Sequence, residues 1–264
     1  MPSVTTPPLG KSLRALCLPT FATHHTAQAK VATAEGWSFD RYLHSLCELE
    51  LGQREQRRKQ RLLAASKLPR EKTMAAFDRG RLKKTAERQV AALVDGAFLD
   101  RAENVLAFGN PGSGKTHLLS AIGHELIDRG RTVAFTTCVL LVQRLLLSKN
   151  QLWLEKELKR LDRFEALIID DIGYVQQSRE EMEVLFTLLA HRYERRSVLL
   201  TSNLVFSDWE RIFKDPMTTA AAIDRLVHHS VVLELNLTSY RAEEARKQRA
   251  GAGKEPSPRT KAFP

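Results

Sequence analysis

The sequence contains only three cysteines among its 264 residues, and they lie far apart at Cys17, Cys47 and Cys138. No two of them form the Cys-x-x-Cys pair that often holds structural zinc, and their odd number argues against a disulfide framework. No uninterrupted apolar run reaches the roughly 20 residues that a membrane-spanning helix needs. The sequence therefore favours a reduced, cytoplasmic protein without a membrane partner.

Aromatic residues are also scarce, at 7% of the chain, and the three tryptophans are scattered along it. Such a distribution provides no stacking platform for single-stranded nucleic acid. Positive charge is in excess instead, since 41 Lys and Arg against 31 Asp and Glu give a formal net charge of +10. This balance favours an anionic partner such as nucleic acid, with a merely basic surface as the alternative.

The first quarter of the chain carries a helical pattern. Residues 1–8 are rich in Pro, Ser and Thr, and we expect them to be disordered. Two short helices divided near Pro19 are predicted between residues 9 and 34, and Ser38 is placed to cap a long helix that follows. Apolar residues recur in that long helix at intervals of three or four. We therefore predict a small all-helical domain over residues 9–69.

The long helix becomes strongly basic from Arg54 onward. Four arginines recur there at helical spacing and share one face, namely Arg54, Arg57, Arg58 and Arg61. A basic helix face can contact the phosphates of duplex DNA, which positions a protein without reading the base sequence. We predict these four side chains as DNA contacts, and a solvated helix face is the alternative.

Strands alternate with helices from residue 104 onward, after a linker at 70–81 and a helix at about 82–98. Five strands are predicted, at Asn104–Phe108, Thr132–Thr137, Glu165–Asp170, Val198–Ser202 and Val231–Leu235. Helices are predicted between them, at Lys115–Arg129, Val139–Arg163, Ser178–Arg195, Ser207–Phe213 and Met217–His228. This alternation implies an α/β fold with a parallel five-stranded sheet and helices on both faces. We assign residues 70–246 to this domain and expect a disordered basic tail over 247–264.

A glycine-rich loop follows the first predicted strand. Residues 109–116 fit the P-loop pattern Gly-x-x-x-x-Gly-Lys-Ser/Thr. The glycines let backbone N–H groups surround phosphate oxygens, and the helix that starts at Lys115 adds the positive end of its dipole. We expect Lys115 to reach the β- and γ-phosphates of ATP. The predicted nucleotide-binding residues are Gly109, Asn110, Pro111, Gly112, Ser113, Gly114, Lys115, Thr116 and His117.

An apolar strand at residues 166–170 ends in two adjacent carboxylates, Asp170 and Asp171. This is the Walker B pattern, in which the first carboxylate meets the Mg²⁺ that the P-loop hydroxyl also holds. We therefore predict Thr116 and Asp170 as Mg²⁺ ligands, and Asp171 as the group that orients or deprotonates the attacking water. A solvated strand end is the alternative, but the position one strand beyond the P-loop favours the metal site.

Two further residues are predicted from their place after the Walker B strand. The strand that ends at Ser202 is expected to lie between the P-loop and Walker B strands, so that Asn203 contacts the γ-phosphate or its water. Thr201 and Ser202 are weaker candidates for that role. Arg225 lies on a later helix, from which an arginine can reach the γ-phosphate of a neighbouring subunit as a finger. A turn residue for Asn203, and a surface charge or an ion pair with the preceding acid for Arg225, are the alternatives.

Taken together, these motifs resemble the DnaA/DnaC branch of the AAA+ ATPases, which are additional-strand P-loop proteins, and within that branch the IstB-type transposition helpers. The resemblance spans roughly residues 9–246. It is carried by residues 102–118, 167–174, 200–204 and 224–226, together with Leu13–Leu16, the basic helix and Phe77-Asp78.

The resemblance implies an ATPase that oligomerises with ATP on duplex DNA, largely without sequence preference, and stimulates or targets a partner transposase in insertion-sequence transposition. Many AAA+ proteins carry Asp-Glu where this chain has the double Asp of IstB- and DnaC-type relatives. The shorter Asp171 implies slow hydrolysis, stimulated by DNA or a partner. Few residues follow Leu235 for a helical lid, which leaves Arg241 as the candidate for a second arginine sensor.

Two other functions stay open at this point. A DnaC-like replicative helicase loader would share the ATPase motifs but use its N-terminal domain to bind a helicase. A small-molecule P-loop kinase would need a lid that binds the phosphate acceptor, and the positions of Asn203 and Arg225 argue against it.

Overall fold

The computed structural model describes residues 9–173, 178–213 and 215–235. The segments predicted to be disordered, 1–8 and 247–264, lie outside these ranges, as does Arg241. The chain divides into two compact units, Met1–Arg61 and Leu62–Pro264. Residues 62–69, which the sequence analysis assigns to the helical domain, fall in the second unit because their leucines join its core, namely Leu62, Leu63 and Leu68.

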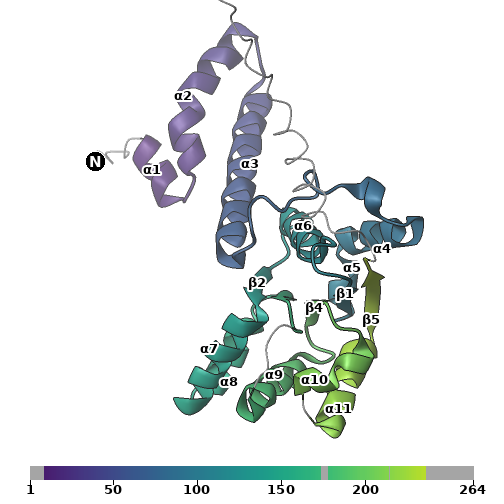
Figure 1. Cartoon of the computed structure of the whole chain (residues 1–264). Helices are drawn as coiled ribbons and strands as arrows, with labels where there is room; N and C mark the ends of the chain where they lie inside the picture. The colour runs from purple at the N-terminus through teal and green to yellow at the C-terminus, as the bar shows by residue number, and fades with distance from the viewer. Residues whose placement is uncertain (1–8, 174–177, 214, 236–264) are drawn as a thin grey trace, which may run out of the picture. The chain divides into compact units, whose positions relative to one another are not determined.

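The first unit contains three helices, as the sequence predicts: α1 (Leu9–Ala15), α2 (Pro19–Ala34) and the start of α3 (Phe39–Ser66) (Figure 1). Ser38 caps α3, since its hydroxyl accepts the backbone N–H of Arg41 at 3.2 Å. A small core of Leu13, Phe21 and Leu46 holds the three helices together. This unit therefore has a core of its own, separate from that of the α/β unit.

Five parallel strands form the single sheet of the second unit. They are β1 (Asn104–Phe108), β2 (Val133–Thr137), β3 (Ala166–Asp170), β4 (Ser197–Ser202) and β5 (Ser230–Glu234), in the spatial order β2-β3-β4-β1-β5. The predicted insertion is confirmed, because β4 lies between the P-loop strand β1 and the Walker B strand β3. Since the strands are parallel, the loops that follow β1, β3 and β4 meet at one edge of the sheet.

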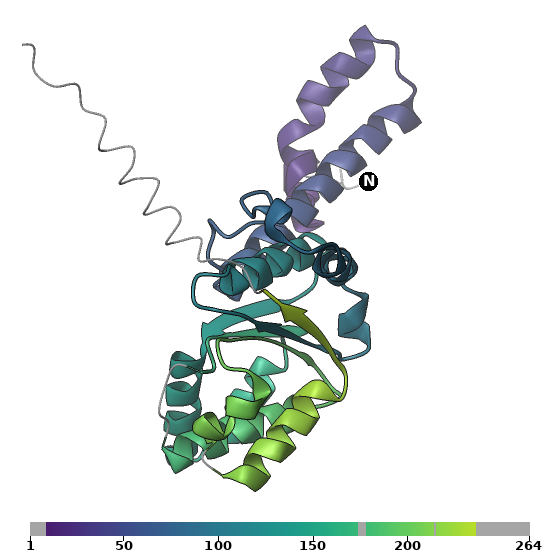
Figure 2. The ribbon, with the colours of Figure 1, turned by 45° about the vertical axis from the view of Figure 1, so that its right-hand side comes forward.

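Helices cover both faces of this sheet (Figure 2). One face is covered by α4 (Lys84–Asp95), α5 (Ala97–Asp100) and α6 (Lys115–Asp128). The other is covered by α7 (Cys138–Asn150), α8 (Leu154–Leu161), α9 (Arg179–Arg192), α10 (Glu210–Phe213) and α11 (Pro216–Val227). Successive strand residues alternate between the two cores: Val105 and Ala107 join the first, Leu106 and Phe108 the second.

Two predicted helices are interrupted in the structure. The stretch predicted at Val139–Arg163 is divided into α7 and α8 by a turn in which Leu152 takes a left-handed conformation, with φ of 61°. No Gly or Pro lies at this break, so the sequence contains no helix-ending residue that would predict it. The helix predicted for 82–98 starts at Lys84, and α4 ends at Asp95, where Gly96 with its φ of 85° caps it before the short α5.

The strand and helix starts around the candidate site agree with the predicted ones to within a residue or two. No helix in the part of the chain that the structure describes is apolar over a length that would cross a membrane.

Candidate nucleotide-binding site

The loop between β1 and α6 closes around the side chain of Lys115. Gly109 has a φ of 155°, and a Cβ at this position would collide with the carbonyl oxygen of Leu235 and lie 2.9 Å from Ser113 Oγ, so only glycine fits. The Lys115 ammonium donates hydrogen bonds to the carbonyl oxygens of Gly109 at 2.7 Å and Asn110 at 3.0 Å. These bonds hold the positive charge inside the loop, where a phosphate can meet it.

The two predicted metal ligands lie in direct contact. Thr116 Oγ1, in the first turn of α6, donates a 2.8 Å hydrogen bond to Asp170 Oδ1 at the end of β3. Thr201 Oγ1 on β4 donates to the same oxygen at 2.7 Å and accepts the backbone N–H of Asp171 at 2.7 Å. Thr201, ranked below Asn203 from the sequence, therefore supports both carboxylate residues. Only its place on the inserted strand could have pointed to this role.

Asp171 differs from Asp170 in backbone conformation and in charge environment. Its φ of 65° is left-handed, a strained conformation for a residue with a Cβ. Burial raises the pKa of the Asp171 carboxyl, the charge of Asp170 raises it further, and Lys115 partly offsets both effects. A carboxylate with a raised pKa accepts a proton more readily, which suits the role of a general base.

Asn203 follows β4 directly, and its side chain points back toward the loop after β3. A Cβ on Gly173 would collide with Asn203 Oδ1, which places the amide against the chain two residues beyond Asp171. Within the described ranges, Asn203 Oδ1 is buried without a hydrogen-bond partner. Ser113 Oγ in the P-loop has the same property. Buried polar atoms normally have partners, so each of these two atoms is a candidate for a hydrogen bond to a bound ligand.

A cavity of about 240 Å³ lies beside the P-loop. One wall consists of residues 112–117 and the other of residues in the segment interpreted from the sequence as a linker, namely Lys72, Ala76, Phe77, Asp78 and Arg81. His117 lies between the two walls, with Nε2 3.0 Å from the Thr73 carbonyl oxygen and its ring edge-on to Phe77. Asn110 and Pro111 are exposed at the tip of the loop instead.

This lining suits a nucleotide. An aromatic ring and apolar carbon can pack against a base, while Asp78 and the basic side chains of the same segment offer polar contacts for a sugar. The sequence analysis missed this wall. The Phe77-Asp78 pair, noted there only as part of the resemblance, was the one signal that could have found it.

Arg225 is not brought to the P-loop of its own chain. Its guanidinium donates to the Ala221 carbonyl oxygen at 3.0 Å and lies 4.8 Å from the ring centre of Phe186. Its backbone carbonyl is close to Asn104, the first residue of β1, whereas the P-loop follows the last. At about 3.3 Å per residue, the length of β1 puts the two ends roughly 13 Å apart. Arg225 therefore lies away from the P-loop of its own chain.

The four arginines predicted as DNA contacts are all exposed on α3, but Arg54 has partners in its own unit. It donates to Glu50 at 2.8 Å and to the carbonyl oxygen of Cys17 at 2.6 Å. Glu50 is only 4% exposed and also accepts the backbone N–H of Thr20 at 2.9 Å. Arg54 thus joins α3 to the turn between α1 and α2.

The chain is similar to known ATP-binding proteins. The chain matches the family of IstB-like ATP binding proteins over residues 11–248. It is 42% identical over 247 residues to an insertion-sequence ATP-binding protein of Sinorhizobium fredii, covering 93% of this chain and 83% of the relative. It is 38% identical over 233 residues to one of Geobacillus stearothermophilus, covering 88% of this chain and 93% of the relative.

Solved structures resemble the fold at lower sequence identity. DnaI superposes with a TM-score of 0.54 at 20% identity, covering 66% of this chain and 96% of its own. DnaA from Aquifex aeolicus, bound to AMPPCP, superposes with a TM-score of 0.52 at 17% identity, covering 74% of this chain and 58% of its own. These likenesses show the fold, and the predicted AAA+ architecture is confirmed.

Proposed function

Because the chain belongs to the family of IstB-like ATP-binding proteins, we propose that it is an ATPase that assembles on duplex DNA and stimulates or targets a partner transposase. The observation that carries the ATPase proposal is the contact between Thr116 and Asp170, which unites the P-loop hydroxyl with the Walker B carboxylate. The insertion-sequence names of the relatives support the transposase as partner.

ATP and Mg²⁺ are the proposed ligands. Thr116 and Asp170 are the side chains that would hold Mg²⁺, which would neutralise charge on the phosphates. Lys115 binds the phosphate oxygens from inside the loop. Asp171 accepts a proton from the attacking water, which the buried Oδ1 of Asn203 helps to orient. The wall around Phe77 receives the base.

Hydrolysis by this arrangement is proposed to be slow and stimulated. The carboxylate of Asp171 is one methylene shorter than that of a glutamate, so it reaches less far toward the water. Arg225 is proposed to complete the site of a neighbouring copy, which requires a homo-oligomer. Full activity then depends on assembly, and the basic face of α3 supplies a largely sequence-independent attachment to duplex DNA.

A DnaC-like helicase loader is the second candidate. The likeness to the DnaC helicase loader, with a TM-score of 0.52 at 16% identity, concerns the fold and does not separate the two functions. What separates them is the partner of the N-terminal unit, since a loader binds a helicase and a transposition regulator binds duplex DNA.

Electron microscopy of the purified protein with duplex DNA and either ATP or ADP tests the proposal. Ordered assemblies that need both ATP and duplex DNA are expected, with none on single-stranded DNA. Lys115→Ala removes the phosphate-binding charge and abolishes them, whereas Lys159→Ala, which removes an equal charge on α8, leaves them intact. A monomer indifferent to duplex DNA with every nucleotide overturns the proposal, and binding to a replicative helicase is then the next experiment.

A further inference from the structure

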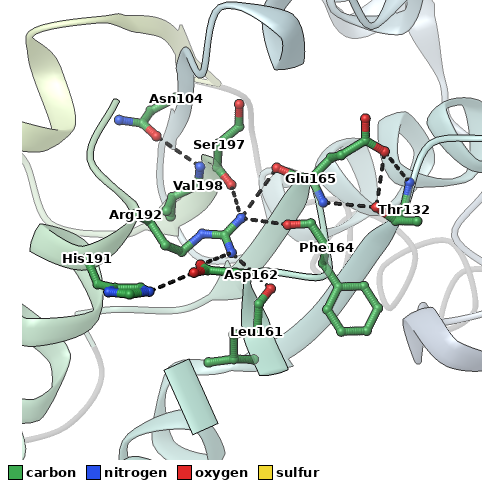
Figure 3. Close-up of polar contacts among 10 residues, drawn as sticks. All are labelled: Asn104, Thr132, Leu161, Asp162, Phe164, Glu165, His191, Arg192, Ser197 and Val198. Atoms are coloured by element: carbon green, nitrogen blue, oxygen red, sulfur yellow. Dashed lines mark hydrogen bonds and ion pairs between the residues drawn. The ribbon is translucent and has the colours of Figure 1, made fainter. Parts of the chain in front are cut away.

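Four elements of the second unit meet at the side chain and backbone of Asn104, the first residue of β1. Its backbone N–H donates to the carbonyl oxygen of His229 at 2.7 Å, just before β5. Its side-chain Oδ1 accepts the backbone N–H of Val198 on β4 at 2.9 Å (Figure 3). Its Nδ2 donates to the carbonyl oxygens of Leu226 at 3.2 Å and Arg225 at 3.4 Å.

The chemistry of this position requires an amide. Asn104 is 7% exposed, and one planar group must accept from a strand and donate to a helix at the same time. The carbonyl groups of Arg225 and Leu226 belong to the last turn of α11, which ends at Val227. Carbonyl groups in a last helical turn have no partner within their helix. Asn104 therefore caps the C-terminal end of α11 from the sheet.

The two strands that Asn104 joins are those that carry the nucleotide site at their other ends. β1 leads into the P-loop, and β4 carries Thr201 and leads into Asn203. The helix end that Asn104 caps carries Arg225. The Asn104 side chain thus connects the two strands that carry the nucleotide site with the helix end that carries Arg225.

The end of α11 has one further contact from the sheet, since Ser230 Oγ at the start of β5 donates to the Val227 carbonyl oxygen at 3.1 Å. Two larger polar groups nearby act on different elements. The buried guanidinium of Arg192 donates to carbonyl oxygens that lie before β3 and at the start of β4, those of Leu161, Phe164, Glu165 and Ser197. The Glu165 carboxylate accepts the N–H and hydroxyl of Thr132 next to β2. Figure 3 shows both groups beside the Asn104–Val198 bond. Within the described residues, the Arg192 guanidinium and the Glu165 carboxylate make no hydrogen bond to α11, whereas the Asn104 amide connects α11 with β4.

We propose that Asn104 is a positioning residue that fixes the end of α11 so that Arg225 is presented to the nucleotide site of a neighbouring copy. The inference rests on the proposed role of Arg225 as a finger. It adds the residue that sets the direction of the finger relative to β1 and β4. Loss of the amide removes the hydrogen bonds to the carbonyl oxygens of Arg225 and Leu226 and leaves the one from Ser230 to Val227, while the P-loop of the same chain keeps its own contacts.

Mixed assemblies test this, because they separate the copy that hydrolyses ATP from the copy that supplies the finger. The recipient carries Arg225→Ala, so its site is intact but it offers no finger. The donor carries Asp171→Asn, so it offers a finger but its own site is inactive. Hydrolysis in the mixture then reports only donor fingers in recipient sites.

Adding Asn104→Ala to the donor is expected to lower the rate of the mixture by roughly tenfold, the scale of one or two lost buried hydrogen bonds. Thr132→Val is the matched donor control, since it removes a hydroxyl at the same edge of the sheet without touching α11. If melting shows that Asn104→Ala does not fold, Asn104→Ser replaces it, because a hydroxyl has one donor hydrogen whereas the Asn104 amide donates to two carbonyl oxygens.

A second readout is independent of activity. Amide hydrogen exchange in residues 216–227 is expected to accelerate in the Asn104 variant and to stay unchanged in the Thr132 variant. The positioning role is overturned if donors with Asn104→Ala match donors with Thr132→Val in hydrolysis rate and in amide exchange while donors with Arg225→Ala are inactive. Donors with Arg225→Ala that still support hydrolysis overturn the proposed finger itself, and with it the inference.

Discussion

Thr201 and Asp170 are joined by a 2.7 Å hydrogen bond in which the threonine hydroxyl donates to the carboxylate oxygen that Thr116 also contacts. The same hydroxyl accepts the backbone N–H of Asp171. A single side chain on β4 therefore fixes the last residue of the neighbouring strand β3 and the residue that follows it. The insertion of β4 between β1 and β3 matters for the site because it provides this support as well as Asn203.

Replacing Thr201 with valine keeps its shape and removes its hydroxyl. Thr201 is 1% exposed, so the Asp171 N–H loses its partner in a buried place, and we expect the free energy of unfolding to fall by about 1–3 kcal/mol. ATP hydrolysis falls with it because Asp170 and Asp171 lose a common support. Thr136→Val on β2 is the matched control, since that hydroxyl bonds only the next carbonyl. Equal stability and hydrolysis of the two variants would contradict this assignment.

The parts of this site that a local pattern encodes could be predicted from the sequence. Gly109 to Thr116 is a continuous motif, and Asp170 ends an apolar run, so the two halves of the metal site followed from spacing and strand order. The support by Thr201 depends on the register between β3 and β4, which a single sequence does not specify. The wall at Phe77 lies in a segment without periodicity. Its role follows from packing across the P-loop, which is a tertiary relationship.

The pKa of Asp171 gives a pH-dependent prediction. Burial and the charge of Asp170 raise this pKa in the folded chain, so the folded state binds the proton more tightly than the unfolded chain does. Ionisation of Asp171 therefore costs stability. The cost is complete above the raised pKa and vanishes below the ordinary value of 3.8. Asp171→Asn removes the charge, and we expect it to raise the melting temperature at neutral pH.

The difference in melting temperature between Asp171→Asn and the parent should shrink as the pH falls through the raised pKa. Thermal unfolding of both proteins across a pH series measures this difference. Asp162→Asn is unsuitable as a control because the Asp162 carboxylate forms an ion pair with His191. Retained ATP binding with lost hydrolysis should accompany the stability gain. A gap that stays constant over the whole series would show that ionisation of the buried Asp171 is not its cause.

Gly173 offers a test of Asn203 that leaves the asparagine in place. A Cβ at residue 173 would collide with Asn203 Oδ1 and lie 3.0 Å from the side chain of Leu204, so Gly173→Ala should displace the amide. We expect ATP hydrolysis to fall while ATP affinity, which depends on the P-loop, changes little. Gly52→Ala in α3 is the contrasting variant, because nothing lies within 4 Å of a Cβ there. That change should stabilise the helix by about 0.5–1 kcal/mol without affecting hydrolysis.

Arg54 should differ from the other arginines on the basic face of α3. Although desolvation raises the pKa of Glu50, hydrogen bonds from Arg54 and Thr20 lower it overall, so this carboxylate is ionised and depends on its partners. Arg54→Ala leaves a buried charge with fewer partners and separates α3 from the turn at Cys17. We expect a lower melting temperature of the N-terminal unit. An Arg54→Ala variant as stable as the parent would contradict this role.

Arg57 and Arg61 are the residues at which the proposed DNA contact is best tested. Both are exposed, and they lie four positions apart on one face of the helix. The salt dependence of duplex DNA binding is measured as the slope of log K against log salt concentration. If each arginine neutralises one phosphate, changing both to alanine lowers the magnitude of this slope by roughly two. Melting should be unaffected. Arg195→Ala with Arg196→Ala removes the same charge from an exposed turn of the second unit and should leave the slope unchanged. Equal slopes for the two double variants would show that the DNA responds to net charge and not to the face of α3.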